Sequence, residues 1–227
     1  EEKVGKKILI SGGGRCNFTN LYASSENYIS QNPHFCKSAL ARYTQHDFIE
    51  LVESYKIAYH EKKLGQLFCD STSRQIVEML LEECSKTGVH VKVNCSVKSV
   101  EKKNNFIVKT NLGDFESGSV VIASGGLSIP KMGATSFGYK IAKQFGVKLT
   151  ETKPALVPLL LSKEDLNKFK NLSGVSIDTI VSNNEISFRE NILFTHKGLS
   201  GPAILQISSY LKENEELKID LIPDRNL

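Results

Sequence analysis

The chain has 227 residues, of which 40% are hydrophobic and 24% are charged, and its formal net charge is +4 at pH 7. These values fit an ordinary soluble globular protein with one large or two small domains. The charge is only mildly basic and the lysines are scattered, which argues against nucleic acid as a partner. No apolar run reaches the ~18 residues of a membrane helix, so no membrane segment is expected.

Cysteine usage indicates a reducing compartment. The five cysteines are Cys16, Cys36, Cys69, Cys84 and Cys95. Their odd number and the lack of a C-x-x-C pair argue against a disulfide framework and a zinc site. The histidines have no metal-binding spacing either, so no metal is expected. The sequence shows no signal peptide, and we expect a cytoplasmic protein; the start without methionine suggests a fragment.

The first part of the chain predicts a strand followed by two helices. Residues 6–10 (KKILI) are short, β-branched and apolar, as in a strand. Residues 44–56 (TQHDFIELVESYK) favour a helix whose N-terminus is capped by Thr44. Residues 71–88 form the clearest helical pattern, with serines before it and Gly88 as its stop. Its predicted buried stripe comprises Ile76, Val77, Leu80, Leu81 and Cys84.

Strands are predicted next. Residues 89–95 (VHVKVNC) alternate between apolar and polar, and residues 96–124 predict two or three strands. The last of these, residues 120–123 (VVIA), is continuously apolar, as expected for a strand buried on both faces. A helix is predicted over residues 137–146. Helix, strand, hairpin, buried strand and helix in this order indicate the α/β class.

The pattern changes near residue 152, where we place a domain boundary. The second part is strand-rich, with strand-like runs on both sides of a short helix capped by Ser162. Another predicted helix has Ser200 as its cap and Pro202 in its first turn. Ser200 does not fit the nucleophile elbow G-x-S-x-G, so a capping role explains this serine better.

The stretch ISGGGRCNFTN, residues 10–20, carries the first candidate site. Gly12 and Gly14 match the first two glycines of the dinucleotide pattern G-x-G-x-x-G, but Asn17 occupies the third position. Glycines let a backbone press against a flat or charged ligand, and Arg15 could neutralise a phosphate or a reduced flavin. The alternative is a glycine turn with a solvated arginine.

A second glycine cluster, Gly125 and Gly126, follows residues 120–123 directly. At the end of a buried strand these glycines would lie at the carboxyl edge of the sheet, where open α/β sheets bind ligands. The alternative is a close-packed strand end. Two glycine clusters, both just after predicted strands in one α/β domain, indicate a cofactor crevice more strongly than either cluster alone.

Three segments together resemble the BaiN/YhiN-like bacterial flavoproteins, in that family's order along the chain. They are GKKILISGGGRCNFTN (residues 5–20), VVIASGGLSIPKMGATSFGYKIAKQFGVKLTETKPALVPL (120–159) and ILFTHKGLSGPAILQIS (192–208). The resemblance implies a flavoprotein that uses FAD and passes hydride from NAD(P)H through the flavin to an unidentified small organic substrate. A non-enzymatic module that binds a partner or RNA, or a site for phosphate alone, remains the alternative.

The resemblance also implies a fold. Residues 1–152 would be part of a Rossmann-like, glutathione-reductase-like FAD-binding domain, with a helical segment at about residues 33–86. Residues 153–227 would be an inserted, strand-rich and barrel-like domain that is incomplete. The family's first G-x-G-x-x-G unit and its last FAD segment have no match here, so we expect this chain alone to bind FAD weakly and to be inactive. Gln66 and Cys69 stand where the family tends to have arginine and proline.

The resemblance assigns cofactor contacts residue by residue. It places Lys7 near the phosphates, Arg15 to Asn17 toward the flavin, Val97 near the adenine, and the second glycine cluster near the pyrophosphate. No catalytic acid or base is assigned, and Cys16 is the one reactive candidate. The expected cofactor-binding residues are Lys7, Ser11, Gly12, Gly13, Gly14, Arg15, Cys16, Asn17, Val97, Ser124, Gly125 and Gly126.

Overall fold

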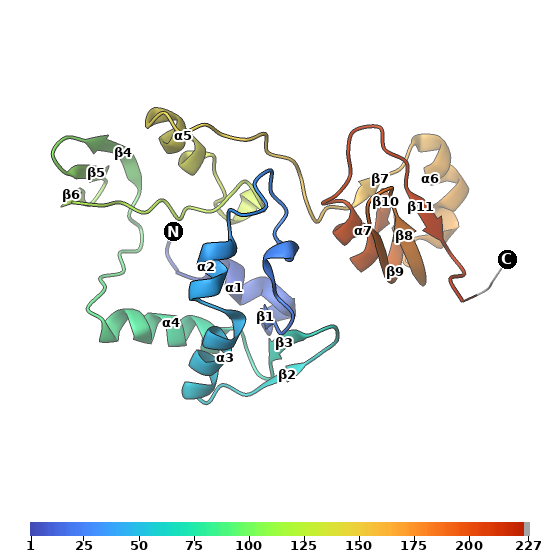
Figure 1. Cartoon of the computed structure of the whole chain (residues 1–227), viewed down its shortest axis with the longest axis horizontal. Helices are drawn as coiled ribbons and strands as arrows, with labels where there is room; N and C mark the ends of the chain where they lie inside the picture. Colours follow the sequence, from blue (N-terminus) through green and yellow to red (C-terminus); the bar gives the residue numbers. More distant parts are fainter. Residues whose placement is uncertain (225–227) are drawn as a thin grey trace. The chain divides into compact units, whose positions relative to one another are not determined.

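The computed structural model describes residues 1–224, which form two compact units (Figure 1). Unit 1 is Glu1–Thr150, and unit 2 starts at Glu151. Each unit has its own hydrophobic core. Within the described part of the chain, no helix has the length and apolar character that crossing a membrane requires. The assignment of the two units to an FAD-binding and an inserted domain stays a prediction.

The first half of unit 1 packs short helices around a small sheet. Its helices are α1 (Lys6–Ile10), α2 (Lys37–Arg42), α3 (Gln45–Ser54) and α4 (Arg74–Lys86), with 3-10 turns η1 (Ser11–Gly14) and η2 (Ser25–Asn27). The sheet has the antiparallel order β1-β3-β2, from β1 (Asn17–Asn20), β3 (Gln66–Cys69) and β2 (Tyr59–Glu61). The core beneath this sheet joins Cys16, Val52, Ile57, Cys69, Ile76 and Met79.

The predicted helices of this half are present. Thr44 caps α3: its side chain accepts a hydrogen bond from the backbone N–H of Asp47, whose carboxylate accepts one in return from the backbone N–H of Thr44. This reciprocal pair satisfies two free donors at the helix start. In α4, Ile76 and Val77 are buried as expected, but Leu81 is 38% exposed. Met79, at 1% exposure, takes its place in the core.

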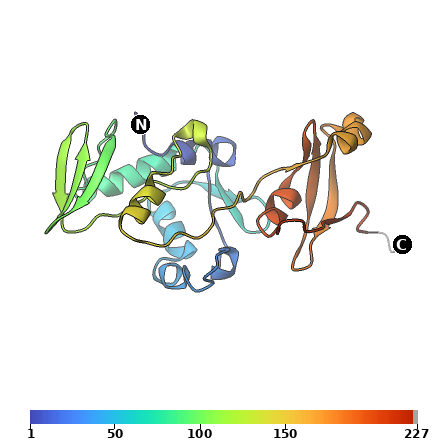
Figure 2. The same ribbon diagram turned by 90° about the horizontal axis from the view of Figure 1, so that it is seen from above.

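The second half of unit 1 holds a separate antiparallel sheet of order β4-β5-β6, drawn in green in Figure 2. Its strands are β4 (Val97–Lys102), β5 (Phe106–Thr110) and β6 (Gly113–Ser117), and α5 (Phe137–Gln144) follows the 3-10 turn η3 (Pro130–Met132). The Gln144 amide donates to the Val100 carbonyl at 2.6 Å. The Phe106 and Phe145 rings meet edge to face. These contacts tie the end of α5 to the sheet.

Unit 2 is a five-stranded antiparallel sheet with a helix packed on it. Its elements are β7 (Leu159–Leu160), α6 (Lys163–Phe169), η4 (Lys170–Leu172), β8 (Ser176–Ser182), β9 (Ser187–Thr195), β10 (Gly198–Ser200), α7 (Pro202–Ile207) and β11 (Lys218–Asp220). The strand order is β11-β8-β9-β10-β7. The α7 residues Ala203, Ile204 and Ile207 are fully buried against this sheet.

Three predicted strands and one predicted helix cap are wrong. Residues 6–10 form the helix α1, since the Leu9 amide donates to the Gly5 carbonyl. Residues 89–95 and 120–123 form no strand: Val91 is 46% and Val121 is 87% exposed. An apolar run becomes a strand only when a neighbouring strand accepts its hydrogen bonds, and none within residues 1–224 does so here. The cap of α7 is Gly201, not Ser200.

The α/β class is confirmed. The more specific predictions, a Rossmann-like domain followed by a barrel-like inserted domain, are only partly met. Every strand pair within residues 1–224 is antiparallel, so the parallel sheet typical of a Rossmann domain is not formed by these strands. The sheet of unit 2 has β11 and β7 at its two edges and does not close, so a barrel is not confirmed.

Candidate functional site

The first glycine loop, residues 11–17, leaves the end of α1 as a tight left-handed turn. Ser11 ends the helix, and its hydroxyl donates to the Ile8 carbonyl at 2.8 Å. Gly12, Gly13 and Gly14 follow with φ of 57°, 66° and 87°, a region that side chains other than glycine enter at a cost.

These glycines serve different purposes. A Cβ on Gly12 would lie 2.7 Å from the Phe68 ring and 2.8 Å from the Asn17 backbone nitrogen, so close packing requires glycine there. A Cβ on Gly13 or Gly14 would meet nothing within 4 Å. The loop is therefore packed on one side and open on the other, which leaves bare backbone facing free space.

The rest of the loop is anchored to β3 and to the start of α4. The Cys69 amide donates to the Arg15 carbonyl at 3.0 Å, and the Ser73 amide donates to the Gly14 carbonyl at 2.8 Å. Cys16 is buried at 4% exposure, with a φ of 52°. The Arg15 side chain is exposed, and no carboxylate among residues 1–224 pairs with it. A rigid loop thus presents an unpaired guanidinium to solvent.

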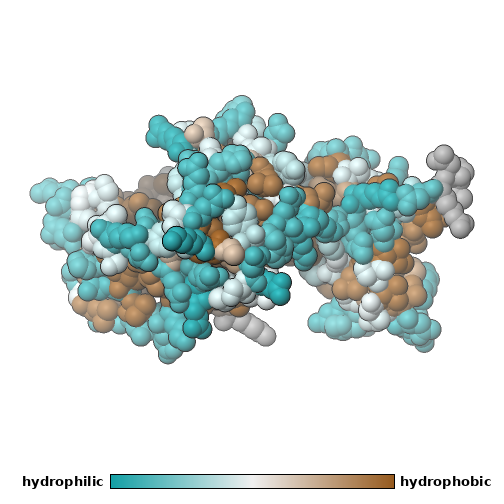
Figure 3. Space-filling model, turned by 90° about the horizontal axis from the view of Figure 1, so that it is seen from below, coloured by the Kyte–Doolittle hydropathy of each residue, from teal (hydrophilic) through white to brown (hydrophobic). Residues whose placement is uncertain are grey.

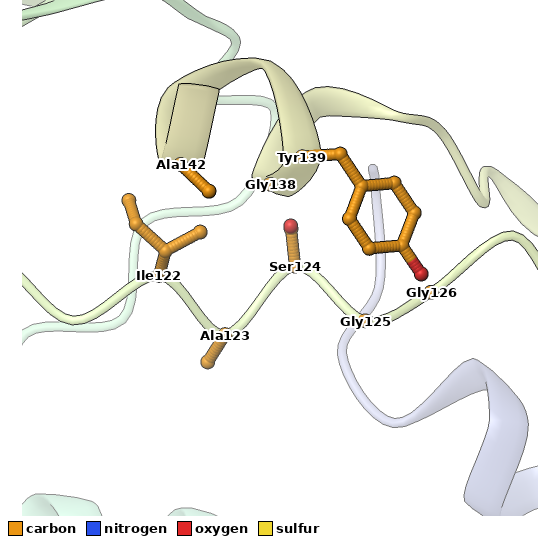
Figure 4. Close-up of a pocket in the computed structure, with 8 residues that line it drawn as sticks. All are labelled: Ile122, Ala123, Ser124, Gly125, Gly126, Gly138, Tyr139 and Ala142. Atoms are coloured by element: carbon orange, nitrogen blue, oxygen red, sulfur yellow. The ribbon is translucent and has the colours of Figure 1, made fainter. Parts of the chain in front are cut away.

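The second glycine loop, residues 122–126, lines an open cavity of about 580 Å³ together with Gly138, Tyr139 and Ala142 of α5. Figure 4 shows the Ser124 hydroxyl directed toward the first turn of α5 and the Tyr139 ring beside the two glycines. Gly138 lets the segment pass close to the helix, because a Cβ there would lie 2.9 Å from the Ser124 hydroxyl oxygen. Gly125 has a φ of 75°, and its missing Cβ would meet nothing within 4 Å.

One hydrogen bond connects α1, which leads into the first loop, to the chain just after the second. The Lys7 ammonium donates to the Ser128 hydroxyl at 2.8 Å. Most of the expected cofactor residues therefore belong to two neighbouring segments of unit 1. Val97 does not: it starts β4 in the separate green sheet, paired with Thr110, and is 39% exposed. The role of each residue remains a prediction.

The two loops fit a flat, anionic cofactor such as FAD. Gly13, Gly14 and Gly125 each leave space that a Cβ would fill, and such bare backbone lets a ring or a pyrophosphate approach closely. The N-terminus of α5, beside Ser124, offers a partial positive charge and free N–H groups. Arg15 supplies a full positive charge.

The structure adds a cluster that the sequence analysis missed. His60 Nδ1 lies 2.6 Å from an Asp70 carboxylate oxygen, and the His60 ring stacks on Phe68 at 6.3 Å between centroids. Phe68 is the same ring that excludes a Cβ from Gly12. The cluster therefore borders the first glycine loop. The register of β2 against β3 brings His60 opposite Phe68, an arrangement that no local pattern in QLFCD indicates.

The neighbouring thiols are packed rather than reactive. Cys69 is fully buried, and this burial, with the nearby Cys16, raises its pKa to about 11. A thiol protonated at neutral pH is a poor nucleophile. All five cysteines are free. The buried position of Cys16 supports a structural role in this core.

Comparison with known proteins identifies the family. The chain matches the model described as HI0933-like protein Rossmann domain over residues 1–198. It is 53% identical over 228 residues to the ribosomal RNA dihydrouridine synthase of Escherichia coli (strain K12), covering 100% of this chain and 57% of that protein. It is 49% identical over 233 residues to the protein of that name from Haemophilus influenzae, covering 100% and 58%.

A more distant relative is the 3-dehydro-bile acid delta(4,6)-reductase of Clostridium scindens, with 26% identity over 237 residues, 99% of this chain and 57% of that protein. The chain thus spans less than three fifths of the length of each of these relatives. The resemblance seen in the sequence is confirmed at the family level, and the names point to an oxidoreductase-type enzyme. The chain belongs to the HI0933-like Rossmann family, which is related to flavin-dependent oxidoreductases.

Proposed function

We propose that this chain is the central part of an FAD-dependent reductase that converts uridine to dihydrouridine in ribosomal RNA. The observation that carries the proposal is the 53% identity, along the whole chain, to a protein named for that reaction. The open glycine loops support it, because they suit a flat redox cofactor. This proposal replaces the small organic substrate expected from the sequence with an RNA.

The chemistry fits what the relatives' names share. Dihydrouridine differs from uridine by two hydrogens across a ring C=C bond, and the bile acid enzyme is also named as a reductase of C=C bonds. When bound, FAD would supply the hydride, which NADH or NADPH delivers to it, and a proton from solvent would complete the addition of two hydrogens across the C=C bond. The protein supplies binding, orientation and electrostatics.

Different residues of this chain would contact different parts of FAD. Gly13, Gly14 and Gly125 leave room for the cofactor, and Lys7 offers a positive charge beside the pyrophosphate. Arg15, which has no carboxylate partner within residues 1–224, offsets the negative charge of the reduced ring. The helix start of α5 offers backbone donors to a phosphate.

A second candidate is the reduction of a small organic molecule with a conjugated C=C bond. The bile acid reductase relative favours it, at the lower identity of 26%. The two candidates share FAD and the glycine loops and differ only in the substrate.

The test uses the full-length protein with two glycine variants. Gly125 and Gly146 have φ of 75° and 72°, and in both places a Cβ would meet nothing within 4 Å. Gly125→Val and Gly146→Val therefore impose the same backbone strain, but only Gly125 lines the cavity. Gly125→Val should lose FAD, measured by flavin absorbance, while Gly146→Val keeps it.

The substrate is tested with ribosomal RNA from cells that lack the gene. Wild-type and Gly146→Val proteins, given NADH or NADPH, should form dihydrouridine, measured by mass spectrometry of the digested RNA, and Gly125→Val should not. A flavin-loaded wild-type protein that oxidises NAD(P)H but leaves the RNA unchanged would favour the small-molecule candidate. Full flavin content in Gly125→Val would show that FAD binds elsewhere.

A further inference from the structure

A second cavity, of about 150 Å³, lies within unit 2 between α6, η4 and the end of β9. Its apolar walls are Leu161, Leu166, Phe169 and Phe194. Phe194 is 7% exposed, and its ring packs on Phe169 at 5.7 Å between centroids. Phe169 itself is 40% exposed, so part of its ring remains free to contact a ligand.

The rim of this cavity is polar and basic. Lys170, Ser173 and His196 lie on it. No carboxylate among residues 1–224 pairs with Lys170 or His196. Lys168, two residues earlier in α6, differs because it is paired with both Glu164 and Asp165. The rim therefore carries positive charge that no acidic group of the described chain neutralises.

The volume of the cavity and the residues that line it indicate which class of ligand it fits. An apolar protein cavity of about 150 Å³ accommodates one six-membered aromatic ring. A purely structural void would be apolar throughout, whereas this one ends in an ammonium, a hydroxyl and an imidazole. An aromatic wall below an unpaired positive rim suits a nucleobase whose phosphate stays outside, since bases stack on aromatic side chains and phosphates pair with cations.

We propose that this cavity is a subsite for one pyrimidine base of single-stranded RNA, stacked on Phe169, with the adjacent phosphate at Lys170 and His196. The inference rests on the proposed function and extends it by assigning part of RNA recognition to unit 2. A pyrimidine has one six-membered ring, the size that a cavity of this volume accommodates, and the larger fused rings of a purine fit it less well.

The test measures binding of fluorescent oligonucleotides to the 227-residue chain by anisotropy. Oligouridylate should bind about tenfold more tightly than oligoadenylate of the same length, because only the pyrimidine enters. Phe169→Leu keeps an apolar side chain in the wall but removes the stacking ring. It should weaken oligouridylate binding about tenfold and reduce the preference over oligoadenylate.

Two matched variants control for fold and charge. Phe188→Leu changes another partly buried phenylalanine of unit 2, one that packs on Tyr210 and does not line the cavity, and it should bind like wild type. Lys170→Ala should reduce the salt dependence of binding by about one phosphate contact. Lys163→Ala removes an exposed lysine at the start of α6, away from the rim, and should leave the salt dependence unchanged.

The failures of the two proposals are distinguishable. No RNA binding, equal affinity for both oligonucleotides, or an unchanged affinity in Phe169→Leu would each overturn the subsite. Dihydrouridine formation by the full-length protein, together with any of these results, leaves the proposed function standing. Pyrimidine preference lost in Phe169→Leu supports the subsite even where the full-length protein leaves ribosomal RNA unreduced.

Discussion

Unit 2 and residues 120–123 of unit 1, which lead into the second glycine loop, differ in whether their apolar side chains are buried. In unit 2, β8 and β9 pair in continuous register, and Val181 and Ile192 are almost fully buried beneath α7. In unit 1, the equally apolar residues 120–123 pair with no strand among residues 1–224, and Val121 is 87% exposed. Apolar character predicts an extended segment, but burial depends on a partner that covers it.

This difference distinguishes a region whose apolar residues form a core from a region whose apolar residues line an open cavity. The core of unit 2 lies between its own sheet and α7, whereas the second glycine loop lines an open cavity. Figure 3 shows apolar residues, in brown, reaching the surface among hydrophilic ones on the face in view. We therefore expect mutations to report on stability where the apolar residues are covered, and on ligand binding where they are not.

The largest expected contrast is between Ile204→Ala and Ile122→Ala. Ile204 is fully buried in α7, so its truncation removes packed atoms and leaves a void, lowering the free energy of unfolding by about 3–4 kcal/mol. Ile122 is 40% exposed, and its truncation should cost less than about 1 kcal/mol. Urea denaturation of both variants measures the difference. Equal losses would mean that the two regions are packed alike.

The next contrast lies within the first glycine loop. Gly12→Ala places a Cβ 2.7 Å from the Phe68 ring, so overpacking adds to the strain of a positive φ, for a total of about 2–3 kcal/mol. Gly13→Ala meets only the backbone strain and should cost about 1 kcal/mol. Thermal unfolding of the two variants tests this ranking. A Gly12→Ala protein as stable as Gly13→Ala would show that Phe68 moves aside freely.

A third prediction uses the buried thiol of Cys69. Its pKa rises from 9.0 to about 11 on burial beside Cys16, so the folded state resists deprotonation. The resulting stability is complete below pH 9 and is lost as the pH rises toward 11. The loss should reach about 2–3 kcal/mol.

The control for this effect is Cys69→Ala, which lacks the titrating group but retains the other alkaline titrations of the chain. Subtracting its unfolding free energy from that of wild type, at each pH, isolates the thiol. A difference that stays constant between pH 9 and pH 11 would contradict the assigned burial effect.

Local signals in the sequence predicted local structure well. The caps of α3 and α6, the helix α4 and the hairpins of β4 to β6 follow from patterns within a few residues of each other. The exceptions involve distant partners. Residues 6–10 have strand composition but form α1, and residues 89–95 alternate without a neighbouring strand. Propensity is a weak preference that long-range pairing overrides.

The sequence singled out the glycine clusters but not their geometry, and the cofactor role of these residues stays a prediction. The glycine clusters stood out in the sequence, yet only the structure shows that Gly12 serves packing while Gly13 and Gly125 face open space. The pairing of Lys7 with Ser128 and the stacking of His60 on Phe68 join residues far apart in the chain or across a hairpin. Contacts of this kind depend on register and side-chain direction, which no local pattern encodes.

The smallest contrast concerns the same capping arrangement in the two units. Thr44 and Ser162 each accept a hydrogen bond from the backbone amide three residues later, that of Asp47 or Asp165. Helix α3 has 10 residues and buries Ile49 and Val52 in unit 1, whereas α6 has 7 residues and buries none.

Since a cap stabilises the fold only through the packing of its helix, Thr44→Ala should lower the free energy of unfolding by about 1 kcal/mol. Ser162→Ala should instead fray α6 locally, with faster amide hydrogen exchange there and a change within about 0.5 kcal/mol. Comparable losses in urea denaturation would show that α6 is as firmly part of its unit as α3.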